Sequence, residues 1–465
     1  MTEEVKELET VFAGKTDIKG AEQASAPAQM SRRGVNNLNA VRGKLEAFDA
    51  ILQDSYHPEK NPNGIINAGI AENGLMSDEI IQYYNEHFKL DKCDLSYGNG
   101  FSCSRELAVA MSELYNDTLK PLQEIKPEHI VAGVGMSAVN GQLGWYLCEP
   151  GEGVLIGAPY YNGFDIELTS QAQAVPVEVQ FRDGVHPLSL EALEDFEMAL
   201  YESRKRGVEV RAILVASPQN PLGWIISRDV LIAYGKFAEK HNIHFISDEI
   251  YSLSIFKSKD VPYPPEFVSS ASINWTELGV DPSRVHILVG ASKDFASNGL
   301  RIGAMISQHN KDLVSAMTSS SVLMKLSSAS DVLWLSVLTN KEYLKYYIVE
   351  NQRRLSESYE KVTGWCRRVG IPYEKACAGF FFLIDLRGFL PSRNEKGEVL
   401  NSDEEKLGEL NSRLLKNKVL FNPGTSYHHR IIGYFRLTHT LYPHTQDLAL
   451  QRAEKVLLQI KQENA

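Results

Sequence analysis

Seven short apolar runs alternate with helical patterns across the middle of the chain, and this alternation constrains the fold more than any other feature. The strand-like runs are His129–Ala132, Gly153–Gly157, Val175–Phe181, Val210–Ala216, Ile243–Ser247, Val285–Val289 and Ile302–Ser307. The helical segments between them are Ala138–Leu147, Asn162–Gln171, Leu190–Lys205 and Ser227–His241. Such alternation predicts an α/β fold with a mainly parallel seven-stranded sheet and helices on both faces.

The two ends of the chain predict a smaller α+β domain. We expect a disordered tail over residues 1–30 and the N-terminal segment of the small domain over 31–90. The large domain is predicted over 91–335. Residues 336–465 complete the small domain with one long helix, several short strands and a closing helix.

Charge and cysteine content argue against several classes of protein. A formal net charge of -11 disfavours nucleic acid or an anionic membrane surface as partner, and no apolar run approaches the length of a membrane span. The five cysteines are scattered without a CxxC pair, which disfavours a disulfide framework and a cysteine-based metal site. Because the N-terminus also has no signal-peptide pattern, we expect a cytoplasmic protein without a bound metal.

Chemically active residue types follow the carboxyl ends of the predicted strands, which is where parallel sheets bind ligands. Lys293 follows the run Val285–Val289 in a small-residue setting, and Arg301 lies eight positions later. A lysine in this position can form a Schiff base with an aldehyde cofactor, and the arginine can bind that cofactor's phosphate. This stretch alone is equally compatible with a surface lysine in a loop.

The loop Gly133–Ala138 joins the first strand of the predicted sheet to a helix. Its glycines and its serine are typical of an anion site at a helix N-terminus. The pattern GxGxxA also fits a dinucleotide-binding loop, although this motif is short and unspecific. A third interpretation is purely structural, because the start of a helix needs small residues in any case.

Three other strand ends carry an aromatic, an amide and a carboxylate. Tyr161 can stack on a flat heterocycle or simply pack against the core. Asn220 lies in a rigid turn between two prolines, from which it can donate a hydrogen bond to a ligand oxygen. Asp248 ends a buried strand, where its partner is either a protonated pyridine nitrogen or a helix N-terminus. Together with the lysine and the anion loop, these residues match what pyridoxal phosphate requires.

These motifs resemble the 1-aminocyclopropane-1-carboxylate synthase-like branch of the class I and II aminotransferases, which are fold-type I pyridoxal-phosphate enzymes. The resemblance runs from about Gly64 to the C-terminus. The motifs that carry it are Gly69–Asn73, Pro159–Asp165, Ser217–Gly223, Asp248–Tyr251, Ser292–Phe295 with Gly299–Gly303, and Pro423–Ser426 with Gly433–Arg436.

The resemblance implies a role for each matching residue. Asp248 is implied to be the partner of the pyridinium nitrogen, and Arg436 to bind the substrate's α-carboxylate, with Glu72 either lining that pocket or serving as a loop carboxylate. Tyr97 resembles a tyrosine that reaches the neighbouring subunit's active site, which implies a homodimer with a shared active site. The implied catalytic residues are Lys293, Tyr97 and Tyr161. The implied cofactor-binding residues are Gly135, Met136, Ser137, Tyr161, Asn220, Asp248, Tyr251, Ser292, Lys293 and Arg301.

Two departures from the family pattern bear on these roles. Gly290 stands where the family usually has a phosphate-binding serine or threonine. Tyr97 lies in Ser-Tyr-Gly-Asn-Gly, whereas the plant enzymes usually have a DYHG-like setting. The first departure concerns the cofactor's phosphate, and the second concerns the substrate.

The implied reaction begins when an amino acid loses its α-proton. The resemblance favours an aminotransferase-like enzyme or a carbon–sulfur lyase of secondary metabolism, as among fungal members of this branch. The alternative is a 1-aminocyclopropane-1-carboxylate synthase that acts on S-adenosylmethionine. Two other classes are disfavoured. A nicotinamide dehydrogenase has no need for Lys293, Asp248 and Arg436 together. A cofactor-binding protein without catalysis has no need for an intact Lys293 and Arg436.

Overall fold

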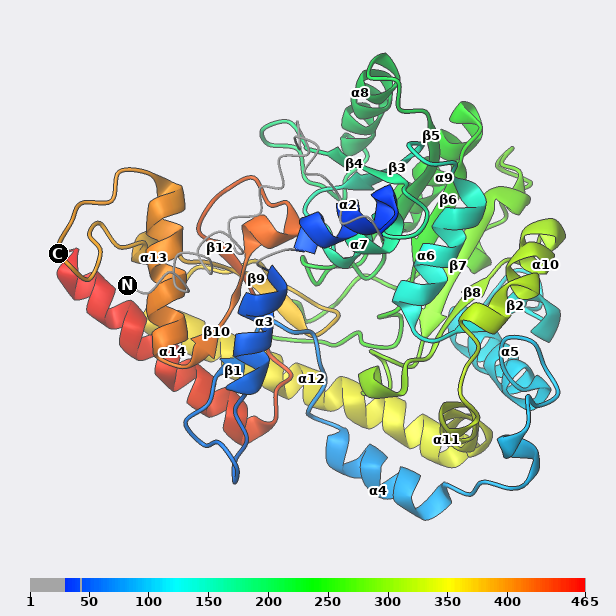
Figure 1. The fold of residues 1–465 in the computed structure, drawn as a ribbon, viewed down its shortest axis with the longest axis horizontal. Coiled ribbons are helices and arrows are strands. Elements are labelled where there is room, and N and C mark those ends of the chain that lie inside the picture. Colours follow the sequence, from blue (N-terminus) through cyan, green and yellow to red (C-terminus); the bar gives the residue numbers. More distant parts are fainter. Residues whose placement is uncertain (1–29, 42–43, 465) are drawn as a thin grey trace. The chain divides into compact units, whose positions relative to one another are not determined.

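The computed structural model describes residues 30–41 and 44–464, which form two compact units (Figure 1). The larger unit comprises Glu72–Glu360 and Lys375–Phe381. The smaller unit comprises the described residues up to Ala71, Lys361–Glu374 and the chain from Phe382 onward. The tail predicted over 1–30 lies outside the described residues except for Met30, and the predicted domain boundaries at 90 and 335 stay a prediction.

The larger unit contains the predicted seven-stranded, mainly parallel sheet, which is confirmed (Figure 1). Its strands are β2 (Ile130–Gly133), β3 (Gly153–Gly157), β4 (Val175–Val179), β5 (Val210–Ala216), β6 (His244–Asp248), β7 (Val285–Gly290) and β8 (Gly303–Ile306). The order across the sheet is β2-β8-β7-β6-β5-β3-β4, and β8 pairs antiparallel with both of its neighbours. Every strand except β8 therefore runs in the same direction.

Helices cover both faces of this sheet, because successive side chains of a strand point to opposite faces. On β5, Ala212 and Leu214 belong to one core cluster, whereas Ile213 and Val215 belong to another. The first cluster includes residues of α6 (Met136–Leu147), α7 (Gly163–Thr169) and α10 (Lys311–Ser319). The second includes residues of α8 (Ala192–Lys205) and α9 (Arg228–His241).

A third core cluster packs against the β2, β8 and β7 side of the sheet. Its strand residues include Ile287 and Val289 of β7, with Ala304 and Ile306 of β8. The helices that contribute to it are α4 (Ser77–His87), α5 (Arg105–Leu119), α11 (Ser328–Thr339) and the first part of α12 (Lys341–Val369). The single long helix α12 supplies residues to both compact units.

The smaller unit contains the short strands and helices expected of an α+β domain. Its three-stranded sheet has the order β11-β12-β9, and β1 pairs in parallel with β10. The strands are β1 (Ile66–Asn67), β9 (Phe381–Asp385), β10 (Val419–Leu420), β11 (Asn422–Pro423) and β12 (Tyr434–Thr438). The helices are α2 (Arg32–Val41), α3 (Lys44–Gln53), α13 (Asp403–Lys416) and α14 (Pro443–Glu463).

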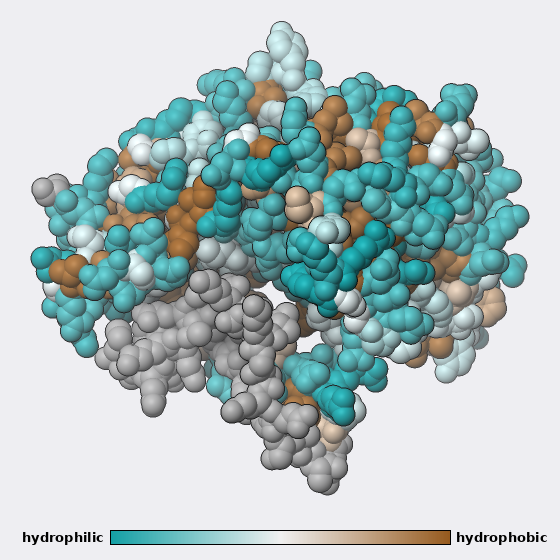
Figure 2. All heavy atoms as spheres, turned by 90° about the horizontal axis from the view of Figure 1, so that it is seen from above, coloured by the Kyte–Doolittle hydropathy of each residue, from teal (hydrophilic) through white to brown (hydrophobic). Residues whose placement is uncertain are grey.

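The face drawn in Figure 2 is mainly hydrophilic, with apolar side chains scattered across it. None of the helices in the described ranges is both long enough and apolar enough to cross a lipid bilayer.

Candidate functional site

The carboxyl ends of the parallel strands meet at one edge of the large sheet and bring the predicted residues together. Gly135 follows β2, Tyr161 follows β3, and Asn220 follows β5, while Asp248 is the last residue of β6. Ser292 and Lys293 come directly after β7, and Arg301 precedes the antiparallel strand β8 at the same edge. Residues separated by up to 166 positions in the sequence thus share one edge because the strands share one direction.

Gly135 and Arg301 form a close-fitting cradle at the start of α6. Gly135 has φ +89, and a Cβ built on it would lie 2.2 Å from Nη2 of Arg301, so only glycine fits between them. Gly303 approaches in the same way, because its Cβ would lie 2.6 Å from the backbone nitrogen of Met136. The first N–H groups of a helix have no acceptor within it, so Met136, Ser137 and the Arg301 guanidinium together suit a phosphate.

Ser292 adds a hydroxyl at the same edge. Its Oγ is buried and has no hydrogen-bond partner among the residues that the structure describes. Gly290, the departure noted above, has no room for a hydroxyl, since its Cβ would lie 2.6 Å from the carbonyl oxygen of Ile302. The close pairing of β7 with β8 therefore excludes a serine where the family usually has one, and Ser292 is the buried hydroxyl of this segment.

Lys293 lies half-buried in the turn after β7. With the Asn298 amide turned so that its oxygen faces the lysine, Nζ donates a hydrogen bond to that oxygen at 3.2 Å. In the same orientation the amide nitrogen donates to the carbonyl oxygen of Ser292. Asn298 also accepts a hydrogen bond at its backbone carbonyl from Nη1 of Arg301 at 2.8 Å, so one residue contacts both the lysine and the arginine.

Asp248 is a buried carboxylate beside this lysine. The backbone N–H of Ile250 donates to Oδ1 at 3.2 Å, and the side chain is 6% exposed. The pKa of Asp248 is raised to about 7, mainly by burial and also by the negative charges of Glu167 and Glu249, while the Ile250 hydrogen bond and the charge of Lys293 lower it. A cation placed against this carboxyl would favour its ionised form and offset the cost of burial.

Tyr161 and Asn220 are held by residues around them. The Tyr161 ring lies over Gly163 and meets the Phe164 ring edge to face, with centroids 5.3 Å apart. Asn220 is buried in a turn whose Ser217–Pro218 and Asn220–Pro221 peptide bonds are cis. Asn220 is thus buried, and Tyr161 is partly buried against a neighbouring ring.

Tyr251 lies one turn beyond β6 and is also buried. The rings of Phe380 and Phe381 meet it edge to face at 5.3 and 5.4 Å. These two phenylalanines belong to the larger unit although they come from a distant part of the sequence. Tyr251 therefore remains with the other strand-end residues of the predicted site.

Arg436, Glu72 and Tyr97 do not stand at strand ends of the large sheet. Arg436 belongs to the smaller unit, where it is buried, donates to the carbonyl oxygen of Gly69 and lies 4.4 Å from the centroid of the Tyr427 ring. Glu72 is exposed at the start of the larger unit. Tyr97 is 91% exposed, so its side chain projects from the surface of this chain.

The site contains three residues that the sequence did not single out. Glu167 is buried beside the α6 helix, where Nδ2 of Asn140 donates to Oε2 at 2.8 Å. Gln219 fixes the asparagine turn, since its Nε2 donates to the carbonyl oxygen of Pro159 at 2.6 Å. Asp294 accepts hydrogen bonds from Oγ of Ser254 at 2.6 Å and from the backbone N–H of Leu253 at 3.0 Å.

Of these three residues, only Glu167 could have been identified from a pattern in the sequence. It lies three positions after Phe164 and one before Leu168, both of which are core residues, so helical spacing places its carboxyl on the buried face. Gln219 and Asp294 stand in turns, and only the folded chain shows that their partners come from other strand ends.

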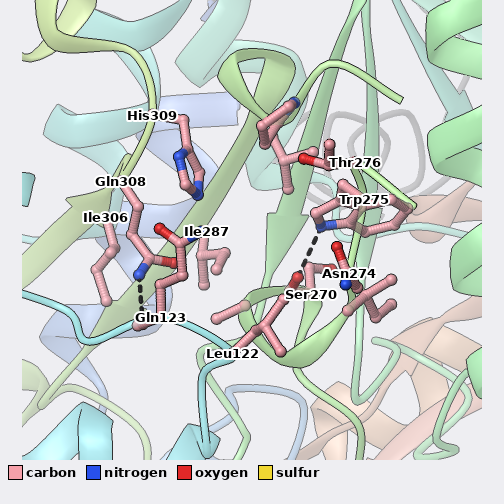
Figure 3. Close-up of a pocket in the computed structure, with 14 residues that line it drawn as sticks. Leu122, Gln123, Ser270, Asn274, Trp275, Thr276, Ile287, Ile306, Gln308 and His309 are labelled. Carbon is pink, nitrogen blue, oxygen red and sulfur yellow. Dashed lines mark hydrogen bonds between the residues drawn. The ribbon is translucent and has the colours of Figure 1, made fainter. Parts of the chain in front are cut away.

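A small pocket lies at the opposite edge of the sheet, beside Val285 at the amino end of β7 (Figure 3). Nε1 of Trp275 donates to the carbonyl oxygen of Ser270 at 2.9 Å, and Nε2 of Gln308 donates to that of Gln123 at 2.7 Å. The pocket residues thus bind one another, and they stand at the other end of the strands from Lys293 and Asp248.

Comparison with known proteins agrees with this arrangement. The family model for aminotransferase class I and II matches residues 77–452. A "Probable aminotransferase aclI" from Aspergillus oryzae is 31% identical over 93% of this chain and 99% of its own length. A human "Probable inactive 1-aminocyclopropane-1-carboxylate synthase-like protein 2" is 31% identical over 90% of this chain and 72% of its own length.

Solved structures have the same fold. The aspartate aminotransferase of Thermus thermophilus with maleate is similar at a TM-score of 0.68 and 20% identity, over 92% of this chain and 99% of that one. The match to the family model spans both compact units and includes the strand ends that carry Lys293, Asp248 and Gly135. The chain therefore belongs to the class I and II aminotransferases, a family of pyridoxal-phosphate-dependent enzymes.

Proposed function

We propose that this enzyme uses pyridoxal 5'-phosphate to remove the α-proton of an amino-acid substrate, in transamination or in β-elimination from a carbon–sulfur bond. The observation that carries this proposal is the meeting of Lys293, the buried Asp248 carboxyl and the Gly135–Arg301 cradle at one edge of the sheet. A lysine, a carboxylate and an anion site are the three protein groups that this cofactor requires.

The cradle and the hydroxyls fit the cofactor's phosphate. Gly135 leaves its backbone open to a phosphate oxygen, and Arg301 supplies a planar cation beside it. The N–H groups of Met136 and Ser137 favour an anion through the helix dipole. The buried Oγ of Ser292, which has no partner among the described residues, is suited to donate to a phosphate oxygen.

The remaining residues fit the cofactor's ring. Asp248 is assigned to the protonated ring nitrogen, because an adjacent cation offsets the cost of a buried carboxylate. Asn220 and Tyr251, both buried, are assigned to the phenolic oxygen, and Tyr161 is assigned to the face of the ring. These assignments rest on the position of each residue at a strand end and on the family pattern.

Lys293 is the proposed base. When bound, pyridoxal phosphate supplies an electron sink for the pair left behind when the α-carbon loses its proton. Nζ of Lys293 accepts that proton and can return it to another atom, which selects the product. The contact with Asn298 keeps Nζ at the strand edge.

Arg436 is the proposed site for the substrate's α-carboxylate. A buried guanidinium presents two parallel N–H groups to a carboxylate, which adds orientation to charge. Nδ2 of Asn422 donates to the carbonyl oxygen of Gly69 at 3.1 Å and to Oη of Tyr427 at 2.8 Å, so the surroundings of Arg436 are themselves hydrogen-bonded. Glu72 is proposed to line the substrate pocket.

The alternative reaction is closure of S-adenosylmethionine to a cyclopropane amino acid. It begins with the same proton removal, so the residues at the sheet edge do not separate it from the other two reactions. The change in the setting of Tyr97 favours transamination or elimination. A cofactor-binding protein without catalysis is a remote alternative, because Lys293 and Arg436 are both present.

We also propose a homodimer in which Tyr97 serves the partner subunit's site. Large apolar side chains are exposed beside it in the chain and in the segment before Lys325, which contacts its loop: Leu95 is 82% exposed, Phe101 77%, Val322 73% and Leu323 77%. Exposed apolar groups gathered in this way mark a surface that another protein covers. A second copy of this chain is the occupant proposed, since a phenol that is 91% exposed has no role within its own subunit's cluster.

The proposed location is a reducing compartment such as the cytoplasm. All five cysteines are free, and four of them are buried. Burial raises the pKa of the Cys103 thiol to about 12, so this side chain behaves as a small apolar group rather than as a reactive thiolate.

Lys293 is tested by the spectrum of the bound cofactor. Purified protein supplied with pyridoxal phosphate should absorb visible light, and Lys293→Ala should abolish this absorbance because it removes the only proposed covalent attachment. Borohydride reduction followed by peptide mass analysis should locate the cofactor on Lys293. The control variant Lys311→Ala, at an exposed helix start, should keep the spectrum. An unchanged spectrum in Lys293→Ala would refute the central assignment.

Asp248 makes a pH-dependent contribution to the cofactor-free protein. Because the pKa of Asp248 is about 7 in the folded chain and 3.8 for an unperturbed aspartate, the folded state keeps a proton that the unfolded chain has lost between these pH values. The contribution of this carboxyl to the free energy of unfolding is greatest below about pH 4. It decreases by up to about 4 kcal/mol as the pH rises to about 7. Asp248→Asn should therefore lose less thermal stability than wild type between pH 5 and pH 8.

The matched control for this experiment is Asp229→Asn, which changes an exposed carboxylate in the first turn of α9. Its unfolding temperature should follow that of wild type across the same pH range. Equal declines in wild type and Asp248→Asn would contradict the raised pKa of Asp248.

Arg436→Ala should raise the KM for the amino acid by on the order of 100-fold, because two charge-assisted hydrogen bonds are lost. The spectrum of the bound cofactor should stay, since Arg436 is not among the residues proposed to hold the cofactor. Arg436→Lys keeps the charge but loses the paired N–H groups, and should fall between wild type and Arg436→Ala. A wild-type KM in Arg436→Ala would rule out its proposed role.

Product analysis separates the three reactions. Wild type and Lys293→Ala are incubated with an S-alkyl cysteine, with S-adenosylmethionine, and with common amino acids plus a keto acid. Pyruvate with ammonia identifies the carbon–sulfur lyase, a new amino acid identifies transamination, and a cyclopropane product identifies the alternative. Absence of all three products from wild type with bound cofactor would contradict the proposed function.

A further inference from the structure

The loop that carries Tyr97 joins the short helix Cys93–Leu95 to α5 and is fastened at several points. Nδ2 of Asn99 donates to both carboxylate oxygens of Glu106, at 3.0 and 2.9 Å. Oδ1 of Asn99 accepts from the backbone N–H of Arg105 at 3.0 Å. The loop is therefore held in one shape although the Tyr97 side chain itself is exposed.

Lys325 makes an unusual contact with this loop. Its ammonium donates to the carbonyl oxygens of Tyr97 and of Gly100, and among the residues that the structure describes no carboxylate pairs with it. A hydrogen bond from a charged donor is stronger than one between neutral groups. One side chain thus ties down both sides of the turn at Gly98 and Asn99.

The neighbours of Lys325 link the same loop to the phosphate cradle. The backbone N–H of Leu326 donates to the carbonyl oxygen of Ser102 at 3.0 Å. On the other side, the N–H of Val134 donates to the carbonyl oxygen of Met324 at 2.9 Å. Val134 immediately precedes Gly135, so residues 324–326 form a bridge between the Tyr97 loop and the cradle.

We propose that Lys325 is a positioning residue that presents Tyr97 to the active site of a second copy of this chain. This inference rests on the proposed homodimer and names the residue that sets its shared contact. Lys325 binds only backbone carbonyls, so it acts on the position of the loop and leaves the Tyr97 phenol free to contact the partner. Val322 and Leu323, which immediately precede this bridge, are exposed and are proposed to belong to the surface that this copy covers.

Mixed dimers test this role. One subunit carries Lys293→Ala and the other carries Tyr97→Ala, and two different affinity tags isolate the mixed species. In a shared-site dimer only one site keeps both residues, with Lys293 from one subunit and Tyr97 from the other. The readout is exchange of the α-proton in deuterated water, with a mixture of common L-amino acids, an S-alkyl cysteine and S-adenosylmethionine as probes.

Lys325→Met is then placed on either subunit. On the Lys293→Ala subunit, which supplies the working Tyr97, it should lower exchange by about tenfold or more. On the Tyr97→Ala subunit, whose loop serves no working site, it should change exchange by less than about twofold. Lys325→Arg, which also donates to carbonyls, should restore activity in the first arrangement. Equal losses in both arrangements would overturn the inference, because a general structural defect has no such asymmetry.

Amide hydrogen exchange provides a second readout that does not depend on activity. Lys325→Met should speed exchange in residues 98–103 of the dimer, whereas Lys341→Met, which removes an exposed lysine paired with Glu113, should not. Unchanged protection of this loop in Lys325→Met would overturn the inference. If the parent mixed dimer is inactive while wild type exchanges protons, the shared site itself is wrong, and the positioning role of Lys325 falls with it.

Discussion

The common direction of the strands is the constraint on which the larger unit depends. Six strands run the same way, and β8 runs back between β2 and β7. Their carboxyl ends consequently lie along one edge, and the loop before β8 returns Arg301 to that same edge. The sheet is built from apolar residues, yet its geometry places an ammonium, a guanidinium and a carboxylate side by side. This proximity follows from backbone pairing, because β7 and β8 pair Gly290 with Gly303.

The electrostatic consequence of this arrangement is a concentration of buried carboxylates. Burial raises the pKa of Asp248, Glu249 and Asp294 to about 7 each, and it is also the main cause of the raised pKa of Glu167. At Asp248 the backbone N–H of Ile250 and the charge of Lys293 both lower the pKa, against burial and the charges of Glu167 and Glu249. A cationic ring at Asp248 and a phosphate at Arg301 would neutralise two unbalanced charges at once, so cofactor binding and stability of the folded chain are linked.

The sequence predicted the sheet and placed polar residues directly after its strands, because both features depend on local patterns. Apolar runs of strand length marked the strands, and residues such as Lys293, Asp248 and Asn220 were recognisable as polar groups directly after such runs. The resemblance to a known family then supplied their roles, which the residues alone left open. Gly290 was recognised as a departure, but the reason for it needed the structure, since the carbonyl of Ile302 that excludes a side chain lies just before the neighbouring strand β8.

What the sequence could not predict are contacts between distant segments. Gln219 supports the turn at Asn220 through Pro159, and Lys325 supports the Tyr97 loop across more than two hundred positions. Neither residue type in its local setting differs from an ordinary turn or surface residue. Such supporting residues receive their roles only from the fold.

The two halves of the proposed chemistry therefore have different physical origins. Proton removal depends on groups that one continuous sheet holds in place, so it is common to any substrate that reaches Lys293. We propose that selection among substrates depends on Arg436, Glu72 and Tyr97, none of which stands at a strand end of the large sheet. A change in any of these three residues can alter the substrate while leaving cofactor chemistry intact. The altered setting of Tyr97 is a change of this kind, because it leaves the lysine and the carboxylate at the sheet edge in place.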